Sequence, residues 1–251
     1  MGRPLLVGLV ITLGLALAVV AAVAVEVRVD TGLWRLPDGD DFVRIAQRIG
    51  SRPSKTIYLE RHSVVLRPGQ DNASDGISSV LASAKNEPTR TRAWTGGNAG
   101  WQRLVECVGK TFAPFDVTVT DKPPAHSDYI MVSVGGTPRD IGVKAKNVSG
   151  LAPFNGSVVP RAVVFAFAAQ SGNDVRTVCE TVAMEVAHAY GLDHEYLCKD
   201  VMTYLPHCTA ARSFVDADAP CGETKKRLCE GGGATQNSYR RLAAVLGTRR
   251  R

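Results

Sequence analysis

Several signatures of common protein classes are missing from this sequence of 251 residues. Its six cysteines form no C-x-x-C pair, which argues against a thioredoxin-type redox site and a zinc ribbon. The net charge is +6, but no basic stripe carries interleaved aromatic residues, so nucleic acid is not an expected partner. The glycine run at 231–233 lacks the Lys-Ser/Thr pair of a phosphate-binding loop. The remaining composition, 45% hydrophobic and 22% charged, is that of an ordinary globular protein.

Charge is also missing near the start of the chain, where a short basic beginning at Arg3 precedes an uncharged run over residues 5–25. Ala22-Val23-Ala24 has the small-x-small pattern of a signal peptidase site. We therefore expect residues 1–24 to be a secretory signal peptide. An uncleaved membrane anchor over residues 5–25 is the alternative, because this run is long enough to span a bilayer. Both interpretations place the body of the protein outside the cytoplasm, either secreted or membrane-anchored.

The even number of cysteines agrees with export, because exported domains commonly form disulfides. Six cysteines allow about 15 pairings, so the sequence alone leaves the connectivity open. Proximity along the chain favours Cys198–Cys208 and Cys221–Cys229, which leaves Cys107–Cys179 as a bridge between two predicted helices. Buried free thiols are the alternative.

The rest of the chain is predicted to contain a lead-in segment over residues 25–54 and one domain over residues 55–251 with a cysteine-rich C-terminal part. Residues 68–100 show little periodicity and are expected to form a long surface excursion with a short helix at 77–84. Strands that alternate with helices predict an α/β or α+β domain with a mixed sheet. Apolar spacing predicts helices at 41–49, 101–112, 173–190 and 236–246, and strands at 56–59, 64–66, 116–120, 129–134, 147–154 and 163–168.

One segment, MEVAHAYGLDH at residues 184–194, has the spacing of a metal site. Residues four apart share a helix face, so positions 184 and 188 can face one ion. Gly191 can adopt the left-handed conformation that ends a helix, and the chain can then return His194 to the same point. Glu185 lies one position further around the helix, where it can hold a water molecule beside the metal.

This segment resembles the signature of the metzincin zinc peptidases, H-E-x-x-H-x-x-G-x-x-H followed by a Met-turn. Glu185, His188, Gly191 and His194 match the signature, whereas Met184 replaces its first histidine. The family resemblance covers about residues 55–246 and implies a mixed, mostly parallel sheet, an active-site helix, a Met-turn and a C-terminal helix.

The resemblance also implies roles for individual residues. The sequence DVMTY at 200–204 matches the Met-turn, so Met202 is expected to pack beneath the metal. Zinc on His188 and His194 would activate a water molecule for peptide hydrolysis, with Glu185 as the general base. Tyr204 is expected to stabilise the transition state, and it is the best candidate for an additional oxygen ligand.

Met184 leaves three interpretations of this site open, because catalytic zinc normally has three protein ligands. The chain is a zinc peptidase with weakened or lost activity, a peptide-binding module derived from one, or a copper site built from Met184, His188 and His194. The first two expect a peptide or protein as the partner. Asp193 and His207 are weaker candidates for the missing ligand, and His62 and His126 are expected at the surface.

The signal-peptide interpretation predicts a mature N-terminus near Val25, following the small-x-small site. Mass spectrometry of protein purified from its native host measures this end directly. A full-length chain recovered from the membrane fraction would establish the anchor instead.

Overall fold

The computed structural model describes residues 52–84, 86–145 and 147–249. The expected signal peptide, nearly all of the lead-in segment and the helix expected at 41–49 lie outside these residues. Within the described part of the chain, no helix combines the length and the hydropathy that a membrane span requires.

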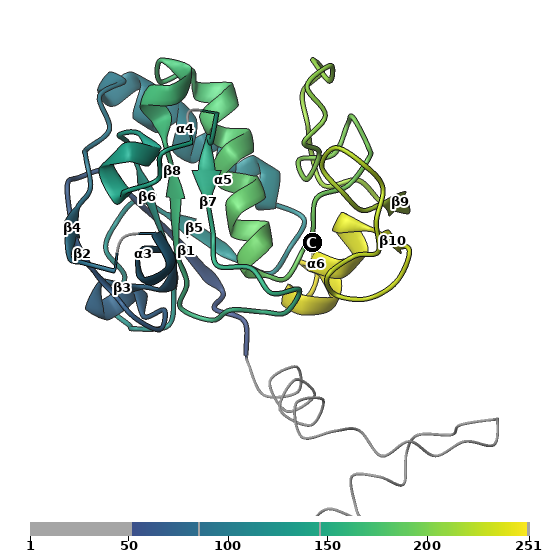
Figure 1. Cartoon of the computed structure of the whole chain (residues 1–251), viewed down its shortest axis with the longest axis horizontal. Coiled ribbons are helices and arrows are strands. Elements are labelled where there is room, and N and C mark those ends of the chain that lie inside the picture. Colours follow the sequence, from purple (N-terminus) through teal and green to yellow (C-terminus); the bar gives the residue numbers. More distant parts are fainter. Residues whose placement is uncertain (1–51, 85, 146, 250–251) are drawn as a thin grey trace, which may run out of the picture. The chain divides into compact units, whose positions relative to one another are not determined.

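A five-stranded, mostly parallel sheet forms the centre of the fold, as the mixed-sheet prediction expected (Figure 1). Its order is β5-β1-β6-β8-β7, and only the edge strand β7 runs antiparallel, beside β8. The strands β6 and β8 are buried along their whole length, which explains the continuous apolar run of β8 and the largely apolar sequence of β6. The strands span Thr56–Glu60 (β1), Thr118–Thr120 (β5), Ile130–Val134 (β6), Gly150–Leu151 (β7) and Val163–Ala166 (β8).

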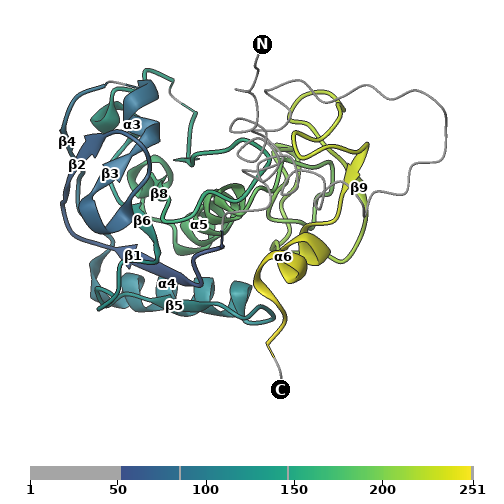
Figure 2. The ribbon, with the colours of Figure 1, turned by 90° about the horizontal axis from the view of Figure 1, so that it is seen from below.

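The two faces of this sheet carry separate cores, because successive side chains of a strand point to opposite sides. Val132 and Val164 pack with the helices α4 (Gly97–Phe112), α5 (Val175–Ala189) and α6 (Ser238–Leu246). Met131 and Val163 pack on the other face with the short helix α3 (Ser79–Ala84). Figure 2 shows α4 and α3 on opposite sides of the sheet.

The segment at 68–100 differs from its prediction as a surface excursion. It contributes to a second sheet, of order β3-β2-β4, and buries Leu81 and Trp94. The short helix expected at 77–84 is present as α3, and β2 (Val65–Pro68) corresponds to the strand expected at 64–66. The other elements of the segment are too short to show a helical or strand period, which explains the error. They are the 3-10 helix η1 (Ala73–Asp75), β3 (Ile77–Ser78) and β4 (Thr89–Arg90).

The C-terminal part after α5 has little regular structure besides α6 and the hairpin of β9 (Ala219–Pro220) and β10 (Thr235–Gln236). Two disulfides, Cys198–Cys208 and Cys221–Cys229, tie its loops together. The third, Cys107–Cys179, joins α4 to α5. The structure therefore has the three expected pairings, and they are compatible with folding in an oxidising compartment.

The Cys107–Cys179 bridge closes the longest loop, with a sequence separation of 72 against 10 for Cys198–Cys208. In the chain-entropy account, a longer closed loop restrains the unfolded state more strongly. Replacing Cys107 and Cys179 together by serine should lower the free energy of unfolding by about 4 kcal/mol, and replacing Cys198 and Cys208 by about 3 kcal/mol. Urea denaturation of both double variants checks this order, and an equal or reversed order would contradict it.

Candidate functional site

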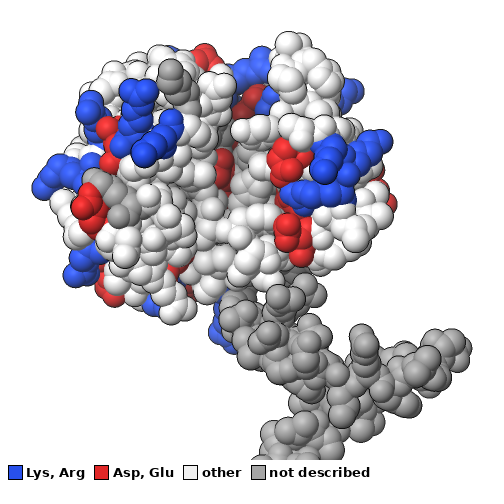
Figure 3. Space-filling view, viewed as in Figure 1, with Lys and Arg blue, Asp and Glu red and all other residues white. Residues whose placement is uncertain are grey.

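Two adjoining cavities lie between β7 with its flanking loops, α5 and the loop after Cys198. The histidine cavity, of about 630 Å³, is lined by His188 and His194, and the methionine cavity, of about 730 Å³, is lined by Met184. Glu185 and Tyr204 line both, so the two form one continuous cleft. The space-filling view shows a groove running across this face (Figure 3).

His188 and His194 meet at the floor of the histidine cavity, as the segment's spacing predicts. Their Nε2 atoms are 3.0 Å apart, and their rings are nearly perpendicular, at 85°. Gly191 makes this approach possible, because its φ of +87° turns the chain sharply after α5. A Cβ at Gly191 would lie 2.9 Å from the backbone carbon of Ser157, so a side chain does not fit there.

Each imidazole is held from behind through its Nδ1 atom. Nδ1 of His188 lies 2.7 Å from the carbonyl oxygen of Leu192, and Nδ1 of His194 lies 3.0 Å from Oε1 of Glu223. Burial would raise the pKa of Glu223, but hydrogen bonds from Arg227 and His194 bring it below its ordinary value. A carbonyl oxygen and a carboxylate only accept, so each Nδ1 donates a hydrogen, and each Nε2 keeps its lone pair when the ring is neutral.

With both rings neutral, the two Nε2 lone pairs face each other across 3.0 Å, an arrangement that is repulsive unless a proton or a metal ion lies between the nitrogens. A proton is disfavoured on His188, because burial and the neighbouring His194 lower its pKa to about 3. A proton on His194, beside the Glu223 carboxylate, would turn the contact into an Nε2–H···Nε2 hydrogen bond. The pair can therefore share one proton or hold a metal ion, and the carbonyl and carboxylate behind it are the partners typical of metal-bound histidines.

Glu185 is the third functional group of the cleft. Its side chain is only 7% exposed, and burial raises its pKa to about 8. It packs against the edge strand β7 so closely that a Cβ at Gly150 would lie 2.5 Å from Cγ of Glu185. The absence of a side chain at Gly150 therefore leaves the space that Glu185 occupies, a relation that local sequence patterns do not reveal.

Met184 and Tyr204 border this arrangement. Met184 is half-buried, packs against the larger core and lines the methionine cavity, one helical turn before His188. Tyr204 is 49% exposed, and its ring centroid is 5.0 Å from that of His194. In the described residues, no third His, Cys, Asp or Glu places a ligand atom within 4.8 Å of both histidines.

The turn at Asp200–Tyr204 places Met202 in the core, where it is fully buried. The Asp200 carboxylate shapes this turn by accepting hydrogen bonds from the backbone N–H groups of Met202 and Val215 and from the Ser238 hydroxyl. The backbone N–H of Glu195 donates to the Met202 carbonyl, 3.1 Å away, and so joins the turn to the segment after His194.

Of the other candidate ligands, Asp193 has a ligand atom within 4.8 Å of those of His194 and Glu223, whereas His207 lies elsewhere. Asp193 is buried and is bound through both oxygens to Arg227, at 2.5 and 2.8 Å, which makes it a structural residue. His207 is exposed beside Cys198 and Cys208, whose sulfurs are joined in a disulfide. His62 and His126 are exposed, as expected.

Glu223 and Arg227 were not predicted from the sequence. They form a network in which the Arg227 guanidinium joins Asp193 to Glu223, and Glu223 contacts His194. Both lie in the loop closed by Cys221–Cys229, about 30 positions after His194. The only local feature that could have pointed to these two residues was the predicted disulfide loop. Such a loop does not indicate the direction in which its side chains point.

Comparison with known proteins adds no assignment: no protein-family model matches this sequence, and no curated protein matches it either.

The buried Asp193–Arg227 pair should dominate the stability of this region. Burial would raise the pKa of Asp193, but hydrogen bonds from Arg227 and from the backbone of Glu230 and His194 lower it overall. The depressed pKa stabilises the fold above the unfolded-state pKa, and this contribution is lost as pH falls through the folded-state pKa. Asp193→Asn should therefore destabilise the protein by about 3 kcal/mol at pH 7 and flatten the acid side of its stability profile.

The matched control is Asp116→Asn, because Asp116 forms an exposed ion pair with Lys55. This change should cost far less than Asp193→Asn, because solvent screens an exposed ion pair. Denaturant unfolding of both variants between pH 3 and 7 makes the comparison. Equal losses in the two variants would refute the structural role of Asp193.

Proposed function

We propose that this protein is an exported zinc peptidase of the metzincin type, with its metal on His188 and His194 and its activity limited by Met184. The observation that carries the proposal is the pair of facing Nε2 atoms, 3.0 Å apart, with Glu185 in the same cleft. The three disulfides support export. The motif at 184–194 and the mostly parallel sheet support the family resemblance.

The histidine pair fits zinc in spacing and in chemistry. Two nitrogens that each bind zinc at about 2.0–2.1 Å in a tetrahedron lie about 3.3 Å apart, close to the 3.0 Å seen here. Zinc accepts neutral imidazole, which is the protonation state that burial favours for His188. The fit is incomplete, because the thioether of Met184 is a poor third ligand for zinc.

Bound zinc would supply Lewis acidity for polarising a peptide carbonyl and activating a water molecule. The protein's own groups supply the rest of the chemistry. Burial raises the pKa of Glu185, and a zinc ion in the same cleft would favour its ionised form. The Glu185 carboxylate would then accept the proton of the attacking water and deliver it to the leaving amine. The Tyr204 hydroxyl would donate a hydrogen bond to the oxygen on which negative charge develops. The carbonyl of Leu192 and the carboxylate of Glu223 keep both imidazoles oriented.

A peptide-binding module without hydrolytic activity is the second candidate function. The specific observation in its favour is Met184, which stands where a third histidine would complete the site. The cleft itself, with its two joined cavities, would be kept in such a protein.

Met184→His separates these two candidates. An imidazole at this position, four residues before His188, would complete a three-histidine shell. Zinc content should rise from substoichiometric to about one per chain, and casein hydrolysis should rise with it. Adding Glu185→Gln should abolish hydrolysis while keeping the zinc. Elemental analysis and a fluorescent casein assay make the measurements.

Thr181→His is the matched control, because Thr181 also lines the methionine cavity but lies seven positions before His188. It should raise neither zinc content nor hydrolysis. A wild-type protein that already holds one tight zinc, unchanged by Met184→His, would show that another group completes the shell. A Met184→His variant that binds zinc yet stays inactive would favour the binding module.

A further inference from the structure

The polar support of His194 comes from one short loop, residues 221–229, which we call the closed loop because a disulfide joins its two end cysteines. Glu223 of this loop accepts a hydrogen bond from Nδ1 of His194 over 3.0 Å. Arg227 of the same loop donates to the same oxygen of Glu223 over 2.6 Å, and it also pairs with Asp193. The closed loop therefore holds the His194 ring through two of its own side chains.

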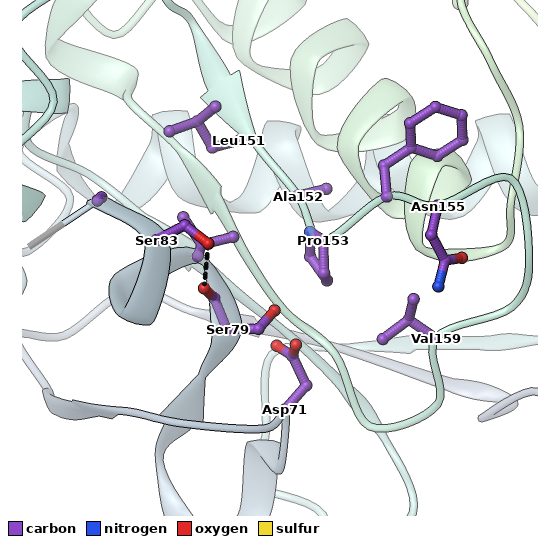
Figure 4. Close-up of a pocket in the computed structure, with 11 residues that line it drawn as sticks. Asp71, Ser79, Ser83, Leu151, Ala152, Pro153, Asn155 and Val159 are labelled. Carbon is purple, nitrogen blue, oxygen red and sulfur yellow. Dashed lines mark hydrogen bonds between the residues drawn. The ribbon is translucent and has the colours of Figure 1, made fainter. Parts of the chain in front are cut away.

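Another wall of the histidine cavity, the segment 151–155, offers no replacement for Glu223. Figure 4 shows side chains of this segment, which are aliphatic apart from the amide of Asn155. The Asn155 Oδ1 atom already accepts the backbone N–H of Ser157 at 3.0 Å. Among the described residues, Glu223 is therefore the group that fixes the His194 ring from behind.

The disulfide is the covalent restraint on the closed loop. Backbone hydrogen bonds also restrain it, from Gly222 to the His194 carbonyl at 3.0 Å and from Arg227 across the loop at 2.9 Å. Each such bond contributes little in water, where an open loop hydrogen-bonds to solvent instead. Lys225 and Lys226 are exposed next to Arg227, and the repulsion between these like charges favours an open loop. A chain with free thiols would keep the weak restraints and lose the covalent one.

We infer that Glu223 is a positioning residue for His194, and that the disulfide of the closed loop holds Glu223 in place, so that oxidation of this loop raises the affinity of the chain for zinc. The inference rests on the proposed zinc site. In the oxidation, the two thiols give up two protons and two electrons as the S–S bond forms, and a disulfide such as glutathione disulfide takes them up and becomes two thiols. An exported chain is reduced in the cytoplasm and oxidised afterwards, so this arrangement would keep the proposed peptidase weak until export.

The zinc affinity of the folded, full-length protein tests the inference, measured by competition with a chromogenic chelator. Cys221→Ser combined with Cys229→Ser should weaken zinc binding about 10–100-fold, the typical loss when a group that orients a metal ligand is removed. Serine is chosen because free thiolates would bind zinc themselves. The matched control is the double serine variant of Cys107 and Cys179, which removes the bridge between α4 and α5. It should lower stability more and leave zinc affinity unchanged.

A second set of variants keeps the test valid if the serine variant of the closed loop fails to fold. Glu223→Ala removes the contact with His194 but keeps the disulfide, and it should weaken zinc binding by the same factor. Combining it with the two serines should cause no further loss, because both changes remove one interaction. Glu230→Ala is the matched control, because Glu230 lines the same cavity but contacts Asp193 through its backbone N–H. This control should leave zinc affinity unchanged.

Nitrogen-15 NMR of the zinc-free protein observes the support of His194 directly. Nδ1 of His194 should carry a proton in the wild type, because a carboxylate only accepts, and Glu223→Ala should shift this proton toward Nε2. A loss of stability alone would not move it. Equal zinc affinities of the wild type and the closed-loop serine variant, or an unchanged His194 signal in Glu223→Ala, would overturn the inference. A wild type with the Nδ1 proton but without affinity for zinc would overturn the proposed function and still confirm the positioning by Glu223.

Discussion

The end of helix α5 at Gly191 is the constraint on which the candidate site depends. His188 lies in the last turn of the helix, and only a chain that reverses within three residues can bring His194 back to it. The positive φ of Gly191 allows this reversal, and the backbone of Ser157 lies so close that no side chain fits. Two hydrogen bonds close the turn, from Gly191 to the His188 carbonyl and from Leu192 to the Ala187 carbonyl. The turn also places the Leu192 carbonyl next to Nδ1 of His188, and this contact orients the His188 ring.

The second imidazole is oriented by a more distant part of the chain. Glu223 reaches His194 from the loop that the Cys221–Cys229 disulfide closes, and Arg227 of the same loop joins Glu223 to Asp193. Asp193 therefore supports the candidate site indirectly, through Arg227 and Glu223, and does not itself face the space between the two histidines. The geometry of the histidine pair therefore depends on the oxidation of Cys221 and Cys229. Without their disulfide, the loop that carries Glu223 would no longer be closed.

The sequence predicted those parts of the structure whose information is local. The apolar runs of β6 and β8 and the helical spacing of α4, α5 and α6 placed these elements within a few residues of their observed bounds. The approach of His188 to His194 followed from a glycine three positions after the first histidine. The helix α3 was expected at 77–84, but the other short elements between residues 68 and 100 were missed because two or three residues show no measurable period. Glu223, Arg227 and Gly150 were missed because their roles depend on contacts between distant segments.

The central claim is that His188 and His194 bind one metal ion through their Nε2 atoms. Anomalous X-ray diffraction at the zinc absorption edge, from crystals equilibrated with zinc, tests this claim most directly. The account predicts one strong anomalous peak between the two Nε2 atoms, within about 2.0–2.1 Å of each. Diffraction that shows no peak there, or a peak only at a surface histidine such as His207, would contradict it.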